Sequence, residues 1–151
     1  MQSLVSSGET IHQRWRLKQL DKIQIILEQH EREILQALRD DLGKPSTEAI
    51  IEIIALKQEL KLAKKNLSKW MSPKRINIPL SLQPGDARVH LEPLGCILII
   101  GPWNYPFSLT IQPLISALAA GNTAVLKPSE NSPNTSKLIS KLFKYYFSEN
   151  I

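Results

Sequence analysis

Two short apolar runs in the second half of the chain constrain its fold most strongly. They are Cys96–Ile100 and Thr123–Leu126, and the first is rich in β-branched residues. Runs of this kind are typical of strands buried on both faces, as in a parallel sheet. Each is followed by a loop and then by residues with helical spacing, at 108–120 and 132–147. This order predicts an α/β fold, the beginning of a doubly wound sheet.

The chain before these runs divides into two further parts. Residues 1–75 carry apolar residues at spacings of three and four, which predicts a helical region. Residues 76–92 instead alternate apolar and polar positions around the turn Pro84-Gly85-Asp86, which predicts a two-stranded excursion. The expected organisation is therefore a helical region at 1–75, a strand excursion at 76–92 and the start of an α/β domain at 93–151.

Residue types mark three helix boundaries. Gly43 is expected to end a helix, because glycine readily adopts the left-handed conformation found there. Ser46 or Thr47 is expected to cap the helix that follows, since their hydroxyls can accept hydrogen bonds from free backbone N–H groups. Ser132 before Pro133 is typical of the start of the last helix.

The composition excludes several classes of protein. Hydrophobic residues make up 42% and charged residues 22%, which is typical of a globular domain. The longest strongly apolar stretch, Ala49–Leu56, is interrupted by Glu52 and is too short to span a membrane. The single cysteine, Cys96, excludes an internal disulfide and is typical of a reducing compartment. We therefore expect a cytoplasmic protein with no transmembrane segment.

The net charge of +5 comes from one segment. Residues 57–75 contain seven lysines and arginines and one glutamate, a local charge of +6, so the rest of the chain sums to −1. A nucleic-acid or anionic-surface binder is one interpretation of this segment. Trp70 is its only aromatic residue, whereas nucleic-acid grooves usually interleave several. A solvated helix face is favoured, and no nucleic-acid partner is expected.

Several motifs that carry chemistry are absent. No two glycines lie two positions apart, which excludes the Gly-x-Gly-x-x-Gly dinucleotide motif, and the phosphate-loop motif is also missing. The three histidines are scattered and there is no Cys-x-x-Cys pair, so no metal site is expected.

Two segments resemble a known family. Gly101-Pro102-Trp103-Asn104-Tyr105-Pro106-Phe107, which continues to Leu114, and Ala119–Glu130 are similar to the NAD(P)-dependent aldehyde dehydrogenase superfamily. The run Asn-Tyr-Pro-Phe-x-Leu-Thr-Ile-Gln-Pro is most similar to its class 3 branch, which acts on fatty and aromatic aldehydes. The resemblance implies that this chain is the incomplete N-terminal part of an enzyme that oxidises an aldehyde to a carboxylic acid with NAD or NADP.

The resemblance also implies an architecture. A Rossmann-like cofactor-binding domain would begin in this chain, after the helical region. The catalytic domain, with the nucleophilic cysteine and the general-base glutamate, is expected to be absent from it. An excursion like that at 76–92 contributes to the subunit interface in the family, so the full-length enzyme is expected to be a homodimer.

Asn104 is the expected catalytic residue. By itself, an asparagine in a loop after a strand is typical of turn geometry. The resemblance implies that its amide N–H donates to the oxygen of the bound aldehyde. A neutral donor suits this role, because it stabilises a developing oxyanion and has no proton to lose.

The expected cofactor-binding residues lie at the ends of the two strands. The resemblance implies that Lys127 and Glu130 hold the adenosine ribose, since an ammonium donates to hydroxyls and a carboxylate accepts from them. Glu130 would tend to repel a 2′-phosphate, which favours NAD over NADP. The remaining expected contacts to the cofactor are Ile100, Gly101, Pro102 and Ser129.

Two aromatic residues and the cysteine complete the candidates. Trp103 and Tyr105 are expected to line the substrate pocket, although a packing role for each is the alternative. Cys96 is not expected to be the nucleophile, because a thiolate is disfavoured within an apolar strand. The alternative to an enzyme is a non-enzymatic product of a truncated gene, or a small interaction module.

We expect the 151-residue chain by itself to have no aldehyde dehydrogenase activity. The resemblance places the nucleophile in a later part of the family sequence, and Cys96 is the only cysteine here. NADH formation with medium-chain and aromatic aldehydes measures this, with Cys96→Ala as the control. Turnover that disappears in the Cys96→Ala variant would contradict the expectation.

Overall fold

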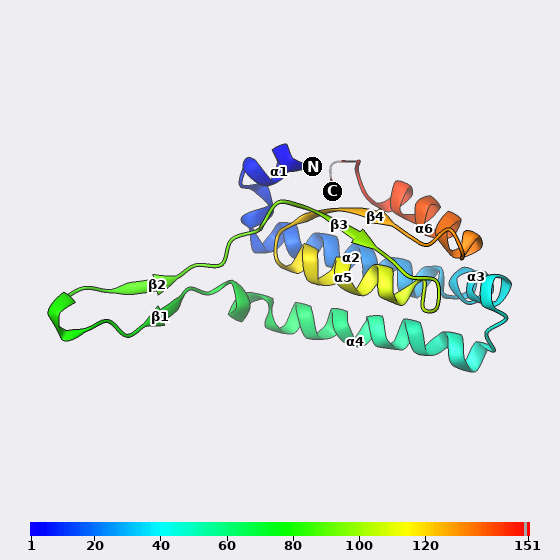
Figure 1. Cartoon of the computed structure of the whole chain (residues 1–151), viewed down its shortest axis with the longest axis horizontal. Coiled ribbons are helices and arrows are strands. Elements are labelled where there is room, and N and C mark those ends of the chain that lie inside the picture. Colours follow the sequence, from blue (N-terminus) through cyan, green and yellow to red (C-terminus); the bar gives the residue numbers. More distant parts are fainter. Residues whose placement is uncertain (150) are drawn as a thin grey trace.

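The helical N-terminal region and the alternation of strands and helices after it are both confirmed (Figure 1). The structure is a computed structural model that describes residues 1–149 and 151. The helices are α1 (Gln2–Ser6), η1 (Glu9–Ile11), α2 (Gln13–Gln29), α3 (Glu31–Leu42), α4 (Ser46–Met71), η2 (Leu80–Leu82), α5 (Ser108–Ala119) and α6 (Pro133–Tyr146). The strands are β1 (Lys74–Ile76), β2 (Ala87–Val89), β3 (Cys96–Ile100) and β4 (Thr123–Lys127).

The helix boundaries agree with the sequence at Gly43 and differ at the next helix. Gly43 follows α3 with a φ of 64°, the left-handed conformation that glycine adopts without strain. The expectation that Ser46 or Thr47 caps α4 is wrong. Pro45 takes that position, and its carbonyl accepts hydrogen bonds from Glu48 N and Ala49 N at 2.9 Å. Proline suits this position because its fixed φ is compatible with the extended backbone there, and no hydrogen bond from its own nitrogen is required.

The strand excursion is a narrow antiparallel hairpin that projects away from the helices (Figure 1). Lys74 pairs with Val89, and Ile76 pairs with Ala87. The paired segments are only three residues each, shorter than the alternating pattern of 76–92 suggests. Two prolines between them, Pro79 and Pro84, lack the backbone N–H that a longer ladder would need.

The two apolar runs form the predicted parallel pair, with α5 as the crossover between them. The expectation that both faces of these strands are buried is wrong. In β3 only Ile99 is buried, whereas Leu98 and Ile100 are 62% and 64% exposed. Cys96 is exposed as well, so the expected burial of its thiol is wrong. The reason is that α5 packs on one face of the pair, and the other face has no comparable cover among the described residues.

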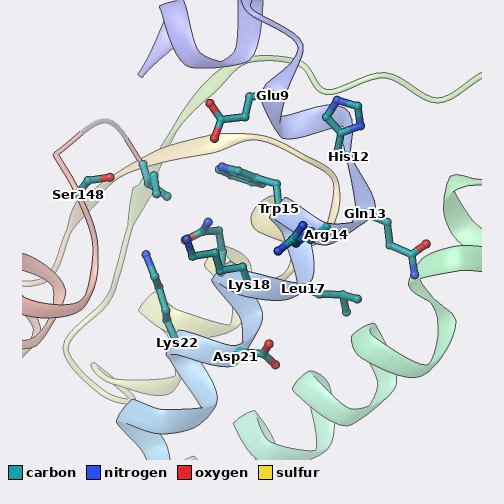
Figure 2. A pocket seen from close by; sticks show the side chains of 12 residues that line it. Glu9, His12, Gln13, Arg14, Trp15, Leu17, Lys18, Asp21, Lys22 and Ser148 are labelled. Carbon is teal, nitrogen blue, oxygen red and sulfur yellow. The ribbon is translucent and has the colours of Figure 1, made fainter.

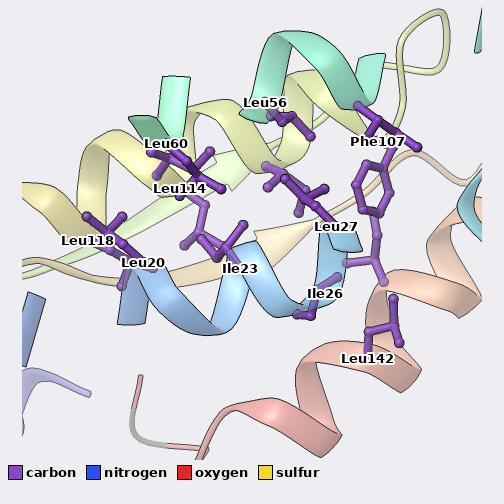
Figure 3. Close-up of a cluster of buried hydrophobic side chains, with 14 of the residues drawn as sticks. Leu20, Ile23, Ile26, Leu27, Leu56, Leu60, Phe107, Leu114, Leu118 and Leu142 are labelled. Atoms are coloured by element: carbon purple, nitrogen blue, oxygen red, sulfur yellow. The ribbon is translucent and has the colours of Figure 1, made fainter. Parts of the chain in front are cut away.

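The core lies between α2, α4 and α5, where aliphatic side chains from the three helices interdigitate (Figure 3). Phe107, at the end of the loop after β3, is fully buried beside them. On the far side, α6 packs against α3 and adds Leu142. The side chains labelled in Figure 3 are Leu20, Ile23, Ile26, Leu27, Leu56, Leu60, Phe107, Leu114, Leu118 and Leu142.

An aspartate from α3 caps the start of α6. Asp41 accepts hydrogen bonds from Asn134 N at 2.9 Å and Thr135 N at 2.7 Å. The helix begins at Pro133 as predicted, but the hydroxyl of Ser132 donates to the carbonyl of Trp103 at 3.3 Å and makes no cap. A carboxylate is favourable there because the N-terminus of a helix carries partial positive charge.

Arg16 binds the C-terminal end of the crossover helix α5. The buried guanidinium of Arg16 donates to the carbonyl of Ala119, the last residue of α5, and to the carbonyl of Thr10, both at 3.0 Å. A Cβ at Gly121 would lie 2.7 Å from the same guanidinium. Glycine at this position therefore leaves room for a cation at the C-terminal end of α5, where cations are favourable.

We expect Asp41→Asn to lower the free energy of unfolding at pH 7 by about 1 kcal/mol, the upper part of the usual range for a charge at the end of a helix. Burial alone would raise the pKa of Asp41, but hydrogen bonds from Thr135 and Asn134 outweigh it and hold the pKa below 3.8. The carboxylate therefore stabilises the fold above about pH 3.8, and this contribution is lost as the pH falls through the lowered pKa. Urea denaturation between pH 7 and pH 2.5 measures the difference. The exposed neighbour Asp40→Asn is the control, and a pH-independent difference would contradict the cap.

Gly101→Ala tests the close approach of α5 to the end of β3. A Cβ at Gly101 would lie 2.0 Å from Thr110 Oγ1, which no real packing permits. We expect Gly101→Ala to lower the free energy of unfolding by about 1–3 kcal/mol, the usual cost of overpacking. The cost should be smaller in a Thr110→Ala background, where the colliding hydroxyl is gone. A double-mutant cycle measures this, and equal costs in both backgrounds would assign the strain to another contact.

Candidate functional site

The C-terminal ends of β3 and β4 lie at one edge of the parallel pair (Figure 1). Ile100 is the register partner of Lys127, and Gly101 N donates to the carbonyl of Lys127 at 3.0 Å. The loop 101–107 therefore begins directly beside the residue that ends β4. Ligands of open α/β sheets bind at this kind of edge.

A second contact joins the loops that follow the two strands. Ser132 Oγ donates to the carbonyl of Trp103, the residue before Asn104. The side chain of Asn104 is exposed to solvent. The structure thus brings Asn104 to the same edge as Lys127 and Glu130, which lie more than 20 positions later in the sequence.

Lys127 and Glu130 form an exposed ion pair at this edge. Lys127 Nζ lies 2.7 Å from Glu130 Oε2, and both side chains are more than half exposed. The hydrogen bond from Lys127 lowers the pKa of Glu130, and the N–H of Glu130 itself lowers it further. Glu130 is therefore a charged acceptor, with a cationic donor next to it.

The other expected cofactor contacts differ in accessibility. Ile100 and Pro102 are exposed, and the side chain of Ile100 lies on the uncovered face of the strand pair. Gly101 is buried under α5. Ser129 is 7% exposed, and its hydroxyl accepts a hydrogen bond from Asn131 N at 3.2 Å. The hydroxyl of Ser129 thus takes part in the turn after β4.

Beneath the loop lies a buried ion pair that the sequence analysis did not identify. Lys44 Nζ lies 2.8 Å from Glu52 Oε1, and the two side chains are 8% and 1% exposed. The other oxygen, Glu52 Oε2, accepts a hydrogen bond from Ser108 N at 2.9 Å. The only signal in the sequence was the interruption of the apolar stretch Ala49–Leu56 by Glu52.

The aromatic residues of the loop are partly accessible. Trp103 is 55% exposed and Tyr105 is 41% exposed. The ammonium of Lys44 lies 3.8 Å from the centre of the Tyr105 ring, a cation–π contact. Lys44 covers part of the tyrosine from beneath, while a substantial part of the ring is left to solvent.

A large hollow lies elsewhere. It has a volume of about 1200 Å³ and lies between the N-terminal half of α2 and the chain's C-terminal residues (Figure 2). Polar side chains such as Glu9, Lys18 and Asp21 line it, and none of the predicted site residues does. A smaller hollow of about 490 Å³ lies along β4 and α6. Neither coincides with the edge that carries Asn104.

Across residues 1–149 and 151, no helix is long and apolar enough to cross a membrane. The same residues hold no group of three or more His, Cys, Asp or Glu side chains that could bind a metal ion.

Known proteins are similar to this chain over nearly its whole length. The sequence profile of the aldehyde dehydrogenase family matches residues 6–146. Aldehyde dehydrogenase family 3 member H1 of Arabidopsis thaliana is 48% identical over 140 residues, which are 92% of this chain and 29% of that protein. The dimeric NADP-preferring aldehyde dehydrogenase of the dog, Canis lupus familiaris, is 35% identical over 97% of this chain and 32% of its own length.

A solved structure matches the whole described fold. The substrate-bound state of AldH from Staphylococcus aureus superposes with a TM-score of 0.94 at 40% identity, covering 99% of this chain and 33% of that one. The chain thus spans about a third of the length of the relatives it matches, and it corresponds to their N-terminal part. From the matched residues and the shared fold we conclude that this chain belongs to the aldehyde dehydrogenase family, in which enzymes oxidise aldehydes with NAD(P).

Proposed function

We propose that this chain supplies one edge of the active site of an NAD(P)-dependent aldehyde dehydrogenase. The observation that carries the proposal is the exposed Asn104 beyond the C-terminal end of β3, at the same edge of the strand pair as the Lys127–Glu130 pair. Asn104 donates its amide N–H to the aldehyde oxygen and stabilises the negative charge that develops there. The nucleophile and the general base belong to the remaining two thirds of the fold.

Lys127 and Glu130 bind the adenosine ribose in this proposal. The pair fits a vicinal diol, because Lys127 offers N–H donors and Glu130 offers charged acceptor oxygens, and both project into solvent at the sheet edge. The bound nicotinamide supplies the hydride acceptor, while this chain holds the ribose and polarises the substrate carbonyl. We favour NAD, because Glu130 repels a 2′-phosphate, although the dog relative is described as NADP-preferring.

Trp103 and Tyr105 form part of the substrate pocket. Their exposed faces flank Asn104 in the sequence and offer apolar and aromatic surface. Such surface suits a fatty or aromatic aldehyde better than a small charged one, because it gains from burying apolar area.

The hairpin of β1 and β2 provides a subunit contact of the full-length enzyme. It projects from the body and carries exposed apolar side chains, among them Leu80 and Leu82. Exposed apolar groups of this kind mark interaction surfaces. The dog relative is described as dimeric, and we propose a homodimer here too. We also propose that the helical region ends at residue 75 and that the α/β domain begins after residue 92. A cytoplasmic location is proposed as well, because the thiol of Cys96 is free.

Asn104→Ala tests the proposed oxyanion role. The variant is made in a full-length enzyme in which residues 1–146 of this chain are joined to the remaining part of the Staphylococcus aureus relative. We expect kcat to fall by about 10²–10³, the typical loss of one oxyanion donor, with little change in the Kd for NAD. Steady-state kinetics with medium-chain and aromatic aldehydes gives kcat, and the change in tryptophan fluorescence on titration with NAD gives its Kd.

Asn66→Ala is the control, because Asn66 bonds only within α4, to the carbonyl of Leu62. It should retain the full kcat. If Asn104→Ala is folded and its kinetics are unchanged, the oxyanion role of Asn104 is wrong. An equal loss in both variants would point to a general defect of the fold.

A further inference from the structure

We propose that Glu52 and Lys44 form a positioning pair that sets the place of Asn104. The inference rests on the proposed function, because it matters for catalysis only if Asn104 contacts the substrate. Neither residue touches the substrate. They act on the loop 101–107, which they hold at two points on either side of Phe107.

The first point is the start of α5. Glu52 projects from α4, and its Oε2 accepts the hydrogen bond from Ser108 N, the N–H of the first residue of α5. This N–H has no partner within its own helix, and the end of the helix carries partial positive charge. The buried carboxylate therefore accepts the free N–H and also balances the partial positive charge of the helix end. It fixes where the loop ends and the helix begins.

The second point is Tyr105, the residue next to Asn104. Glu52 Oε1 holds the ammonium of Lys44 at 2.8 Å, and that ammonium lies 3.8 Å from the centre of the Tyr105 ring. Cation–π contacts become stronger when the cation is shielded from water, and the side chain of Lys44 is only 8% exposed. The charge of Glu52 therefore acts on Tyr105 through Lys44.

The two contacts hold the part of the loop that follows Asn104. Between Tyr105 and Ser108, Phe107 is fully buried beside Leu27 and Leu56 (Figure 3). The residues on the other side of Tyr105, Trp103 and Asn104, remain exposed. The anchoring thus ends at the residue immediately after Asn104.

A role in packing alone does not explain why this pair is charged. Removing two charges from water is costly, and an apolar pair of similar volume often stabilises a fold as well or better. What an apolar pair lacks is direction, because it makes neither the hydrogen bond to Ser108 nor the contact over Tyr105. A misplacement of about 1 Å in a catalytic group can cost on the order of 10²-fold in rate. A directional anchor one residue from the oxyanion donor therefore bears on kcat.

The first experiment uses the 151-residue chain and needs no activity. The double variant Glu52→Gln with Lys44→Met keeps a neutral acceptor for Ser108 N and removes both charges, so that no buried charge is left unpaired. We expect the amides of residues 104–110 to exchange with deuterium at least about tenfold faster than in the wild type, through local opening of the loop. Exchange in α2 and α4 should stay unchanged.

The matched control is Arg16→Gln. Arg16 is a buried charged residue that bonds the opposite end of the same helix, at the carbonyl of Ala119. Like Glu52→Gln, the substitution keeps a hydrogen-bonding group and removes a charge. It should speed exchange near residue 119 and leave residues 104–110 as they are. Glu52→Asp keeps the charge but shortens the side chain by one methylene, so it cannot reach both Lys44 and Ser108. It serves as the second variant if the double variant does not fold.

The second experiment measures kcat and the Kd for NAD in the full-length enzyme described above. We expect the double variant to lose about 10–10² in kcat with an unchanged Kd, and Arg16→Gln to keep kcat at a comparable loss of thermal stability. Wild-type exchange at residues 104–110 in the altered chain overturns the proposal. An equal fall of kcat in Arg16→Gln also overturns it, since the pair would then act through stability alone. If the unaltered full-length enzyme oxidises no aldehyde, the proposed function fails, and the exchange result still decides whether the pair anchors the loop.

Discussion

The arrangement of the α/β part depends on ionised side chains that reach it from the N-terminal helices. Glu52 of α4 meets the first N–H of α5, Arg16 of α2 meets its last carbonyl, and Asp41 of α3 meets the first N–H groups of α6. In each case the sign of the charge opposes the partial charge at that helix end. Because helix ends carry backbone groups without internal partners, these contacts fix where α5 and α6 begin or end.

The consequence is that the helical region and the strand pair share one interior. Buried side chains of α2 and α4 pack in the same hydrophobic cluster as Ile99 of β3 and Ile111 of α5. The cluster supplies the favourable burial, which is not directional. The charged contacts supply direction, and they limit how α5 can slide or rotate over the cluster. Hydrophobic burial therefore stabilises the fold, and the charged contacts determine how its helices are oriented.

Burial and charge also act together at the candidate site. The backbone bond between Gly101 and Lys127 aligns the two strand ends, and the absence of a Cβ at Gly101 lets α5 approach β3 closely. Phe107 anchors the loop by burial, whereas Glu52 and Lys44 anchor it by charge. What is left exposed at the sheet edge is Asn104 with the Lys127–Glu130 pair. A polar edge held by buried anchors suits a group that has to act at a fixed position.

The sequence by itself determined the order of strands and helices after residue 93, the end of α3 at Gly43, and the family, because these are written in local spacing and in contiguous motifs. The resemblance of its two loop segments to the family also singled out Asn104, Lys127 and Glu130, whose roles remain proposals. Only the tertiary structure decided which face of β3 is covered, and therefore that Cys96 and Leu98 are exposed, because hydrophobicity does not specify what packs on it. The roles of Arg16, Asp41, Lys44 and Glu52 were likewise invisible in the sequence. The helix-end backbone groups that Arg16, Asp41 and Glu52 bind lie 56 to 103 positions away along the chain, so only the folded structure brings each charged side chain to its partner.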